Sequence, residues 1–225
     1  MAIYKNFNLF ENEKLLEFNF SSHITIITGG NGQGKTTLFN ILKNQNKINS
    51  KNKLEINDIN NYLITYRHLI FFNGEDVIAA KDFLLDRKFL EVNKLSVNAI
   101  LKSIKEDYPY IDDKILTLDQ FKELNCGTSE RIFLNFLILK AIRHQLNIEI
   151  PLILDAPFTL IDPSYRSPLM NIFAEISNQV IVFLNPDMEK SIENILNKLP
   201  SNKSLRVYRL HNIFDDFPGL RNFYI

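Results

Sequence analysis

The 225-residue sequence contains a single cysteine, Cys126, and therefore no internal disulfide framework. A protein without disulfides suits a reducing compartment such as the cytosol. The sequence also lacks an apolar stretch of the roughly 18 residues that a membrane span needs, and its first residues have neither the basic start nor the apolar core of a secretory signal. We therefore expect a cytoplasmic protein without a membrane partner.

A net charge is also absent, because 26 lysine and arginine residues balance 26 aspartate and glutamate residues. The overall charge therefore gives no argument for binding to a nucleic acid or a membrane surface, and any such binding has to be local. Hydrophobic residues make up 45% of the chain and charged residues 23%. This composition is that of a globular protein with enough core for one large domain or two lobes.

Glycine is scarce, with seven residues in the whole chain. Four of them lie in one short stretch, TGGNGQGKTT, and two others stand in the segments FFNGED and LNCGTSE. A sequence with so little glycine is expected to use it where the backbone must approach another group closely. These three segments are therefore the first places to look for a site.

The stretch from Gly29 to Thr36 fits the phosphate-loop pattern GxxxxGK[ST]. A β-branched run at 24–27 precedes it and apolar residues at helical spacing follow at 38–42, so its context is strand, loop and helix. Lys35 would reach the β and γ phosphates of a nucleotide, and the Thr36 hydroxyl would bind Mg²⁺. The alternative is a flexible turn, but the pattern arises by chance in only about 1% of chains this long.

Strands and helices alternate along the rest of the chain. Apolar runs predict strands at 2–4, 16–20, 24–27, 69–72, 114–118, 152–155, 179–184 and 205–210. Helical spacing predicts helices at 38–42, 77–84, 92–104, 129–146, 167–177 and 188–199, and polar residues predict a loop at 45–53. We therefore expect an α/β fold of the P-loop NTPase type, with a mainly parallel sheet flanked by helices and an N-terminal antiparallel β portion.

The strand at 152–155 ends in a carboxylate, Asp155. A sheet of this kind opens toward a nucleotide at the carboxyl ends of its strands, so Asp155 is the candidate partner of Mg²⁺. A strand-terminal aspartate can instead cap the following turn. With a phosphate loop in the same chain, we favour the metal role.

The segment PLILDAPFTLID (151–162) resembles the Walker B and D-loop segment of ABC-type ATPase heads, and LNCGTSER (124–131) resembles their signature loop. With NGQGKTT and FNGED in the matching order, the chain is similar to heads of the SMC, RecF and RecN group, nearest to DndD-like and YhaN-like ATPases. The resemblance covers essentially the whole chain. It is weakest between 76 and 124, where those relatives insert a long coiled coil. Both a natural form without a coiled coil and an excised head with a short linker fit the sequence.

The resemblance implies one ATPase head, 1–225, with a lobe at 1–110 holding the phosphate loop and Q-loop and a lobe at 111–225 holding the signature, Walker B and D-loop. It implies a homodimer closed around two ATP molecules, in which the signature (Asn125, Cys126 and Gly127) meets the partner's γ-phosphate and Asp162 crosses the interface. The implied ATP-binding residues are Asn31, Gly32, Gln33, Gly34, Lys35, Thr36 and Thr37. The implied Mg²⁺-binding residues are Thr36, Asn73 and Asp155.

Two positions depart from the family pattern. Ala156 follows the Walker B aspartate where most such heads have a glutamate, and a methyl group cannot polarise the attacking water. Asn185-Pro186-Asp187 stands where a switch histidine is expected. Both departures bear on hydrolysis rather than on binding. The implied catalytic positions are Asp155, Ala156 as the place of the missing base, Asn125, Gly127 and Asp162.

We therefore expect an ATPase head that serves DNA repair, DNA maintenance or antiviral defence. The main alternative, which Ala156 favours, is a nucleotide-gated module that assembles a protein complex with little or no hydrolysis. A transporter ATPase subunit is a third, less favoured interpretation. Candidate partners besides a second copy are another protein and non-specific DNA, for which the local basic feature is the set Lys43, Lys47, Lys51 and Lys53.

Overall fold

A computed structural model describes residues 4–11, 14–44, 53–56, 69–73, 76, 80, 82, 84–109, 117–188, 204–218 and 220. The chain divides into two compact units that alternate along the sequence. Unit 1 consists of Met1–Asn73, Ile150–Pro157 and Ser177–Ile225, and unit 2 consists of Gly74–Glu149 and Phe158–Ile176. The single head with lobes at 1–110 and 111–225 stays a prediction.

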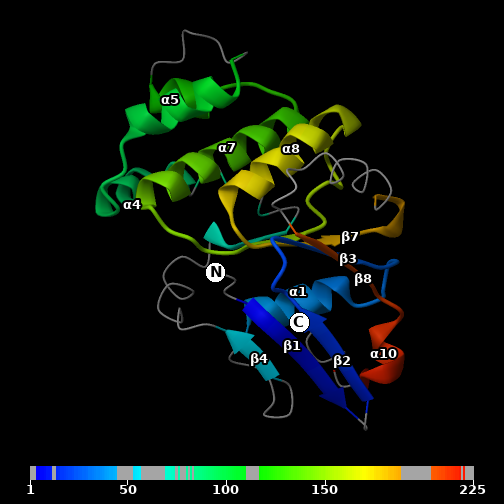
Figure 1. The fold of residues 1–225 in the computed structure, drawn as a ribbon. Helices are drawn as coiled ribbons and strands as arrows, with labels where there is room; N and C mark the ends of the chain where they lie inside the picture. Colours follow the sequence, from blue (N-terminus) through cyan, green and yellow to red (C-terminus); the bar gives the residue numbers. More distant parts are fainter. Residues whose placement is uncertain are drawn as a thin grey trace. The chain divides into compact units, whose positions relative to one another are not determined.

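The core of unit 1 is a parallel sheet with the strand order β5-β6-β7-β3-β8. Figure 1 labels its strands β7, β3 and β8. Its strands are β3 (Ile24–Thr28), β5 (Phe71–Phe72), β6 (Leu152–Asp155), β7 (Val180–Leu184) and β8 (Leu205–Arg209). All residues of the first four are buried, whereas β8 at the edge is partly exposed. Helix α1 (Lys35–Lys43) contacts β6 and β7, and its Phe39 ring packs edge-on against Phe71 and Phe183. The parallel strands therefore read as continuous apolar runs, as expected for a covered sheet.

A second sheet in unit 1 is antiparallel, with the order β2-β1-β4. Its strands are β1 (Tyr4–Glu11), β2 (Lys14–Asn19) and β4 (Lys53–Ile56). Phe7 of β1 pairs with Phe18 of β2, and both side chains are buried. The predicted α/β class, with a mainly parallel sheet and an N-terminal antiparallel portion, is confirmed.

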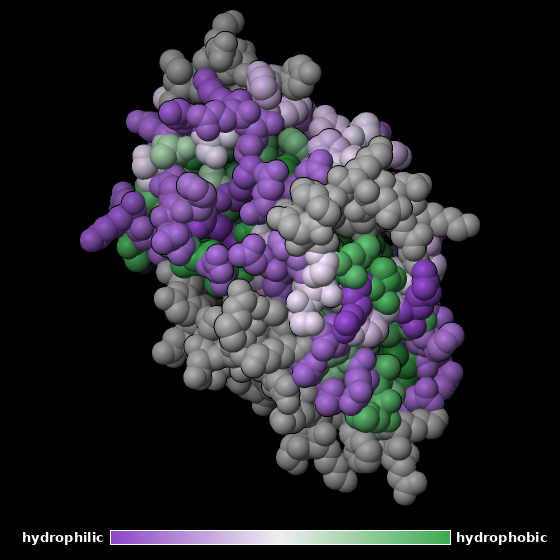
Figure 2. Space-filling view, viewed as in Figure 1, coloured by the Kyte–Doolittle hydropathy of each residue, from purple (hydrophilic) through white to green (hydrophobic). Residues whose placement is uncertain are grey.

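Unit 2 is helical, and its longest helix, α7 (Thr128–Leu146), contacts both α5 (Val97–Asp107) and α8 (Pro163–Ile176) (Figure 1). The smaller helices are α4 (Arg87–Val92) and α6 (Leu118–Lys122). Phe136 of α7 packs edge-on against Phe173 of α8, with ring centroids 4.6 Å apart. On the face shown in Figure 2, the surface over α4, α5 and α7 is largely hydrophilic. None of the helices in the described part of the chain is long and apolar enough to span a bilayer.

Three predicted elements are wrong in whole or in part. The strand at 114–118 is not formed at its described end, because Thr117 caps α6 with a capping box and Leu118 begins that helix. The helix at 92–104 starts at Val97 instead: Lys94 has a left-handed φ of 55°, and Ser96 caps α5. The loop at 45–53 ends earlier, because Lys53 begins β4.

Two further differences concern the C-terminal part of the chain. The helix predicted at 188–199 lies outside the described residues except for Met188. The short helix α10 (Ile213–Asp216) was not predicted, because four residues are too few for a helical period to show. Its Ile213 side chain packs against Gly34 of the phosphate loop.

Candidate functional site

The phosphate loop, residues 29–36, connects β3 to α1 in unit 1. Gly34 is the N-cap of α1 and has a φ of 97°, which is in the region that L side chains rarely adopt. A Cβ at Gly34 would also overlap the Ile213 side chain of α10. Glycine at this position is therefore required both by the backbone and by the packing of α10 behind the loop.

The amino end of α1 is open toward a ligand. No side chain caps it, and its first turn contains no acidic residue. Its free N–H groups and the positive end of the helix dipole favour an anion such as a phosphate. Gln33 closes the loop on itself, since its side-chain oxygen accepts a hydrogen bond from the Gly30 N–H.

Lys35 lies at the centre of the loop and is only 9% exposed. Its Nζ donates hydrogen bonds to the carbonyl oxygens of Gly29, at 2.6 Å, and Gly30, at 2.9 Å. Burial lowers the pKa of Lys35, and the carboxylates of Asp155 and Asp187 oppose this effect. Without a ligand, the Lys35 ammonium is thus bound by carbonyl groups of its own loop. A phosphate group, which is a charged acceptor, can replace these carbonyls as its hydrogen-bond partner.

Thr36 and Asp155 meet although 119 positions separate them, since the Thr36 hydroxyl donates a hydrogen bond to Asp155 Oδ2 at 2.8 Å. Asp155 is 6% exposed. Burial raises the pKa of Asp155, while the Thr36 hydrogen bond and the Lys35 charge act in the opposite direction. Asn73 stands at the same sheet edge, because it follows Phe72, which pairs with Leu154.

These oxygens fit a hard divalent cation. Mg²⁺ is usually held by one or two carboxylate or hydroxyl oxygens, with water and substrate phosphates completing the shell. A dedicated cage is not present in the part of the chain that the structure describes, where no three His, Cys, Asp or Glu side chains cluster. Thr37, in the first turn of α1, is 1% exposed, and its hydroxyl has no hydrogen-bond partner among the described residues. Such an orphaned buried hydroxyl also fits a loop completed by a ligand.

The carboxyl end of β7 lies between the phosphate loop and Asp155. The Gly29 N–H donates to the Leu184 carbonyl at 3.2 Å, and the Ala156 N–H donates to the Phe183 carbonyl at 3.0 Å. Ala156 is partly exposed and has a left-handed φ of 51°. The position of the missing base therefore sits beside the predicted metal site, but its methyl group carries no proton-transfer chemistry.

The signature residues belong to unit 2 and stand before α7. Gly127 is the N-cap of α7, has an ordinary φ of −62°, and lies in open space, with no described atom within 4 Å of a Cβ placed there. Asn125 and Gly127 are exposed and Cys126 is half-buried. No side chain caps α7. By contrast, α4, α5, α6, α8 and α10 are capped by Asp86, Ser96, Thr117, Asp162 and Asn212.

Asp162 has a local structural role in unit 2. Its Oδ1 accepts hydrogen bonds from the Ser164 N–H at 3.0 Å and hydroxyl at 2.8 Å, and these bonds hold the pKa of Asp162 below its ordinary value. The Asp162 N–H donates to Ser129 Oγ at 2.9 Å, and the Ser129 hydroxyl in turn donates to the Leu160 carbonyl at 3.4 Å. Ser129 therefore ties the predicted D-loop to the start of α7, a contact across 33 positions that no local pattern reveals.

The predicted site residues thus fall into two groups. Unit 1 brings together residues 29–37, Asn73, Asp155 and Ala156, and unit 2 brings Asn125, Gly127 and Asp162 near the ends of α7 and α8. Asn31 and Gly32 lie at the exposed tip of the phosphate loop. Lys43 ends α1 with its ammonium 5.6 Å from the centre of the Phe39 ring, whereas Lys47 and Lys51 lie outside the described residues.

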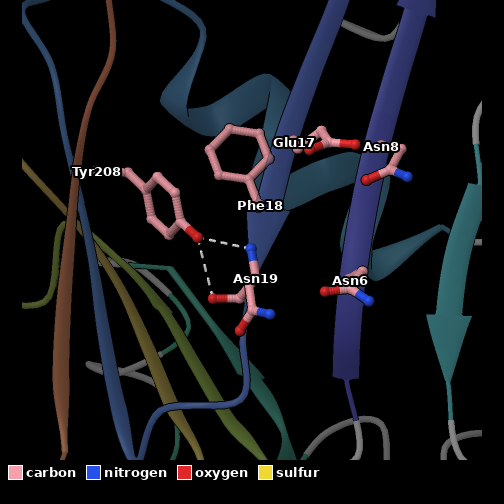
Figure 3. A pocket seen from close by; sticks show the side chains of 6 residues that line it. All are labelled: Asn6, Asn8, Glu17, Phe18, Asn19 and Tyr208. Atoms are coloured by element: carbon pink, nitrogen blue, oxygen red, sulfur yellow. Dashed lines mark hydrogen bonds between the residues drawn. The ribbon is translucent and has the colours of Figure 1, made fainter.

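A cavity of about 300 Å³ elsewhere in unit 1 is lined by none of the predicted site residues (Figure 3). Tyr208 of β8 forms one wall, and its hydroxyl donates to the Asn19 carbonyl at 3.1 Å and accepts from the Asn19 N–H at 2.6 Å, which joins the two sheets. The other lining residues are Asn6, Asn8, Glu17 and Phe18. With one carboxylate and no cation in its lining, this cavity does not suit a phosphate group.

No protein-family model matches the sequence, and no curated protein sequence matches it significantly. Solved structures do match its fold. The ATP-binding protein of an ABC transporter from Pyrococcus furiosus is 17% identical with a TM-score of 0.54, over 93% of this chain and 96% of that one. A nucleotide-free ATP-binding cassette from an ABC transporter is 14% identical with a TM-score of 0.51, over 100% and 99% of the two chains.

An SMC head domain from Thermotoga maritima is 14% identical with a TM-score of 0.51, over 84% of this chain and 92% of that domain. The chain therefore has the fold of ABC-type ATPase heads. At these identities the likeness establishes the fold alone, and it is shared equally by transporter cassettes and an SMC head.

Proposed function

We propose that this chain is an ABC-type ATPase head that binds Mg·ATP in unit 1 and closes a homodimer around two nucleotides. The observation that carries the proposal is the 2.8 Å hydrogen bond between Thr36 and Asp155 beside a glycine loop that holds Lys35. An ordinary strand-to-helix turn has no reason to bury a lysine and bring a hydroxyl to a buried carboxylate. A phosphate loop needs all three groups.

In this proposal the residues of the phosphate loop bind the nucleotide. The loop N–H groups and Lys35 bind the phosphates, and Thr37 supplies a further hydroxyl. Thr36 and Asp155 hold Mg²⁺, with Asn73 at the same edge. When bound, Mg²⁺ neutralises charge on the β and γ phosphates.

The dimer is supported by Gly127. Its φ suits any residue, and the space around it is open, so nothing within the described chain requires glycine there. The open amino end of α7 and the bare backbone beside it suit the close approach of an anion from outside. The γ-phosphate of ATP bound to a second copy is the anion we propose, by resemblance to the signature loop.

The finer assignment rests on the motifs. We place the chain with DndD-like and YhaN-like heads, in DNA repair, DNA maintenance or antiviral defence, because DAPF and the signature loop resemble the SMC group. Ala156 supports a second candidate function, a nucleotide-gated module that assembles a protein complex with little turnover. In both cases ATP drives assembly. A transporter subunit is less favoured on the same motifs.

The decisive experiment is calorimetry of ATP binding with and without Mg²⁺, together with light scattering of the same samples. We expect wild-type protein to bind ATP and double its mass, and Lys35→Ala to lose affinity by about 10²-fold, because the phosphate charge is left uncompensated in a partly dry site. Lys43→Ala is the matched control in the same helix. Unchanged affinity for Lys35→Ala would contradict the site, and an unchanged mass with ATP would contradict the dimer.

A further inference from the structure

We propose that Asp187 supplies the carboxylate that orients and deprotonates the attacking water during ATP hydrolysis, in place of the side chain that Ala156 lacks. This inference rests on the proposed function of unit 1. It concerns a residue that follows β7, the strand between the one that leads into the phosphate loop and the one that ends in Asp155.

Strand register gives the position. In the parallel sheet, Leu184 of β7 pairs with Thr28 of β3, and Phe183 pairs with Asp155 of β6. The last two carbonyls of β7 accept the N–H groups of Gly29 and Ala156. The chain therefore leaves β7 between the phosphate loop and the position of the missing base, and Asp187 is three residues further on.

The turn after β7 keeps Asp187 close to that edge. The Met188 N–H donates to the Asn185 carbonyl at 3.0 Å, and residues 186–188 form the first turn of a helix that begins two residues after β7. Asp187 is exposed. Its charge acts on the Lys35 ammonium, where it opposes the lowering of the pKa of Lys35 by burial. The Asp187 carboxylate and the Lys35 ammonium, which binds the γ-phosphate in the proposed function, therefore lie at the same edge of the sheet.

Among the described residues at the end of β6, neither Asp155 nor Ala156 suits the role. Asp155 is buried and accepts the Thr36 hydroxyl, so its oxygens serve the metal rather than a water molecule. Ala156 has no titratable group. An exposed carboxylate, in contrast, can take a proton from water and release it to the solvent.

The step balances without another reactant. The water oxygen forms a bond to the γ-phosphorus, the bond from that phosphorus to the β–γ bridging oxygen breaks, and the bridging electron pair leaves with ADP. The proton of the water passes to the Asp187 carboxylate and then to the solvent. Because Asp187 lies in the helical turn after β7 and not directly after Asp155, we expect a slower reaction than a glutamate at 156 would give.

The test compares Asp187→Asn and Asp187→Glu with wild type in two measurements. Single-turnover phosphate release reports the chemical step, and calorimetry compares the affinity for Mg·ATP with that for Mg·ADP plus aluminium fluoride, which mimics the transition state. We expect Asp187→Asn to lose turnover by about 10²-fold, the lower end of general-base effects, to bind ATP at least as tightly as wild type, and to lose affinity for the fluoride complex. Glu17→Gln, another exposed carboxylate of unit 1, is the matched control and should change neither.

Rescue distinguishes chemistry from folding. Asp187→Glu should keep part of the turnover, and adding Ala156→Glu to Asp187→Asn should restore it, because the carboxylate then returns at the neighbouring position. Turnover of Asp187→Asn within about threefold of wild type would overturn the inference, a change too small for a lost general base. ATP binding without measurable turnover in the wild type would also overturn it, yet would leave the nucleotide site standing. Absence of ATP binding by the wild type would refute the proposed function itself.

Discussion

The amino ends of α1 and α7 both follow a glycine and both lack a side-chain cap, yet the two glycines meet different constraints. Gly34 has a φ of 97° and lies against Ile213, whereas Gly127 has a φ of −62° and open space around it. The described helices α4, α5, α6, α8 and α10 have capping side chains. An uncapped helix end is costly unless something else satisfies its N–H groups.

The difference shows how to separate a glycine required by the fold from one required by a ligand. The protein itself explains Gly34, because a side chain there would strain the backbone and displace α10. The described chain does not explain Gly127, whose bare backbone would serve a ligand of a second copy under the proposed function. Stability measurements alone should therefore tell the two positions apart, without any ligand.

The largest expected effect is the contrast between Gly34→Ala and Gly127→Ala. A side chain at Gly34 adds left-handed strain of about 1–2 kcal/mol and overpacking of about 1–3 kcal/mol, so we expect a loss of about 2–5 kcal/mol in the free energy of unfolding. Gly127→Ala should stay within about 0.5 kcal/mol of wild type. Urea denaturation of the ligand-free proteins measures both. Equal losses of unfolding free energy for Gly34→Ala and Gly127→Ala would contradict the distinction between the two glycines.

The second prediction adds the ligand. Gly127→Trp places a bulky side chain where a second copy's nucleotide should approach, so it should weaken ATP-dependent dimerisation by at least about tenfold, as steric clashes at interfaces do. ATP affinity of the monomer should not change, because Gly127 belongs to unit 2 and the phosphate loop to unit 1. Light scattering and calorimetry on the same samples test this. Normal dimer formation by Gly127→Trp would remove the reason given for this glycine.

Much of unit 1 could be predicted from the sequence, because its signals are local. Buried apolar runs predicted β3, β6 and β7, and the glycine loop predicted the turn into α1. The position of Asp155 at the end of β6 was predicted from the apolar run before it, and its role at the site stays a prediction. Its hydrogen bond to Thr36 spans 119 positions, so the sequence suggested the pair but not the contact.

The errors have equally specific causes. Thr117 and Leu118 look like a continuing β-pattern, but the capping box formed by Thr117 and Gln120 starts a helix there. The helix expected from 92 is interrupted at Lys94, where no glycine marks the left-handed turn. Ser129 accepts a hydrogen bond from the Asp162 N–H in the predicted D-loop through tertiary structure alone, and neither side of that contact has a sequence pattern.

The third prediction returns to unit 1 and concerns Asp155→Asn. Because burial raises the pKa of Asp155 above 3.8, the folded state disfavours the charged carboxylate. The carboxyl group's contribution to stability is therefore complete below about pH 3.8 and is lost as the pH rises through the folded pKa. Ligand-free Asp155→Asn should then melt above wild type at pH 7, with the advantage vanishing toward pH 3.8, while Mg²⁺-dependent ATP binding falls. A melting temperature of Asp155→Asn below that of wild type at pH 7 would show that the charged carboxylate does not destabilise the folded protein.

The smallest expected effect concerns DNA. The net charge is zero, so any binding depends on the local set Lys43, Lys47, Lys51 and Lys53. A dimer would present this set twice, and each neutralised phosphate contributes a slope of about −0.9 to the salt dependence of the affinity. We expect weak, sequence-independent duplex binding that strengthens severalfold with ATP and drops when the four lysines are changed to glutamine. Gly127→Trp should lose the ATP-dependent part of the affinity, because without the dimer the lysine set is present only once. Fluorescence anisotropy at low salt measures all of these. DNA affinity that does not change with ATP would show that DNA binding does not depend on the dimer. No DNA binding at all would indicate that a protein partner makes the DNA contact.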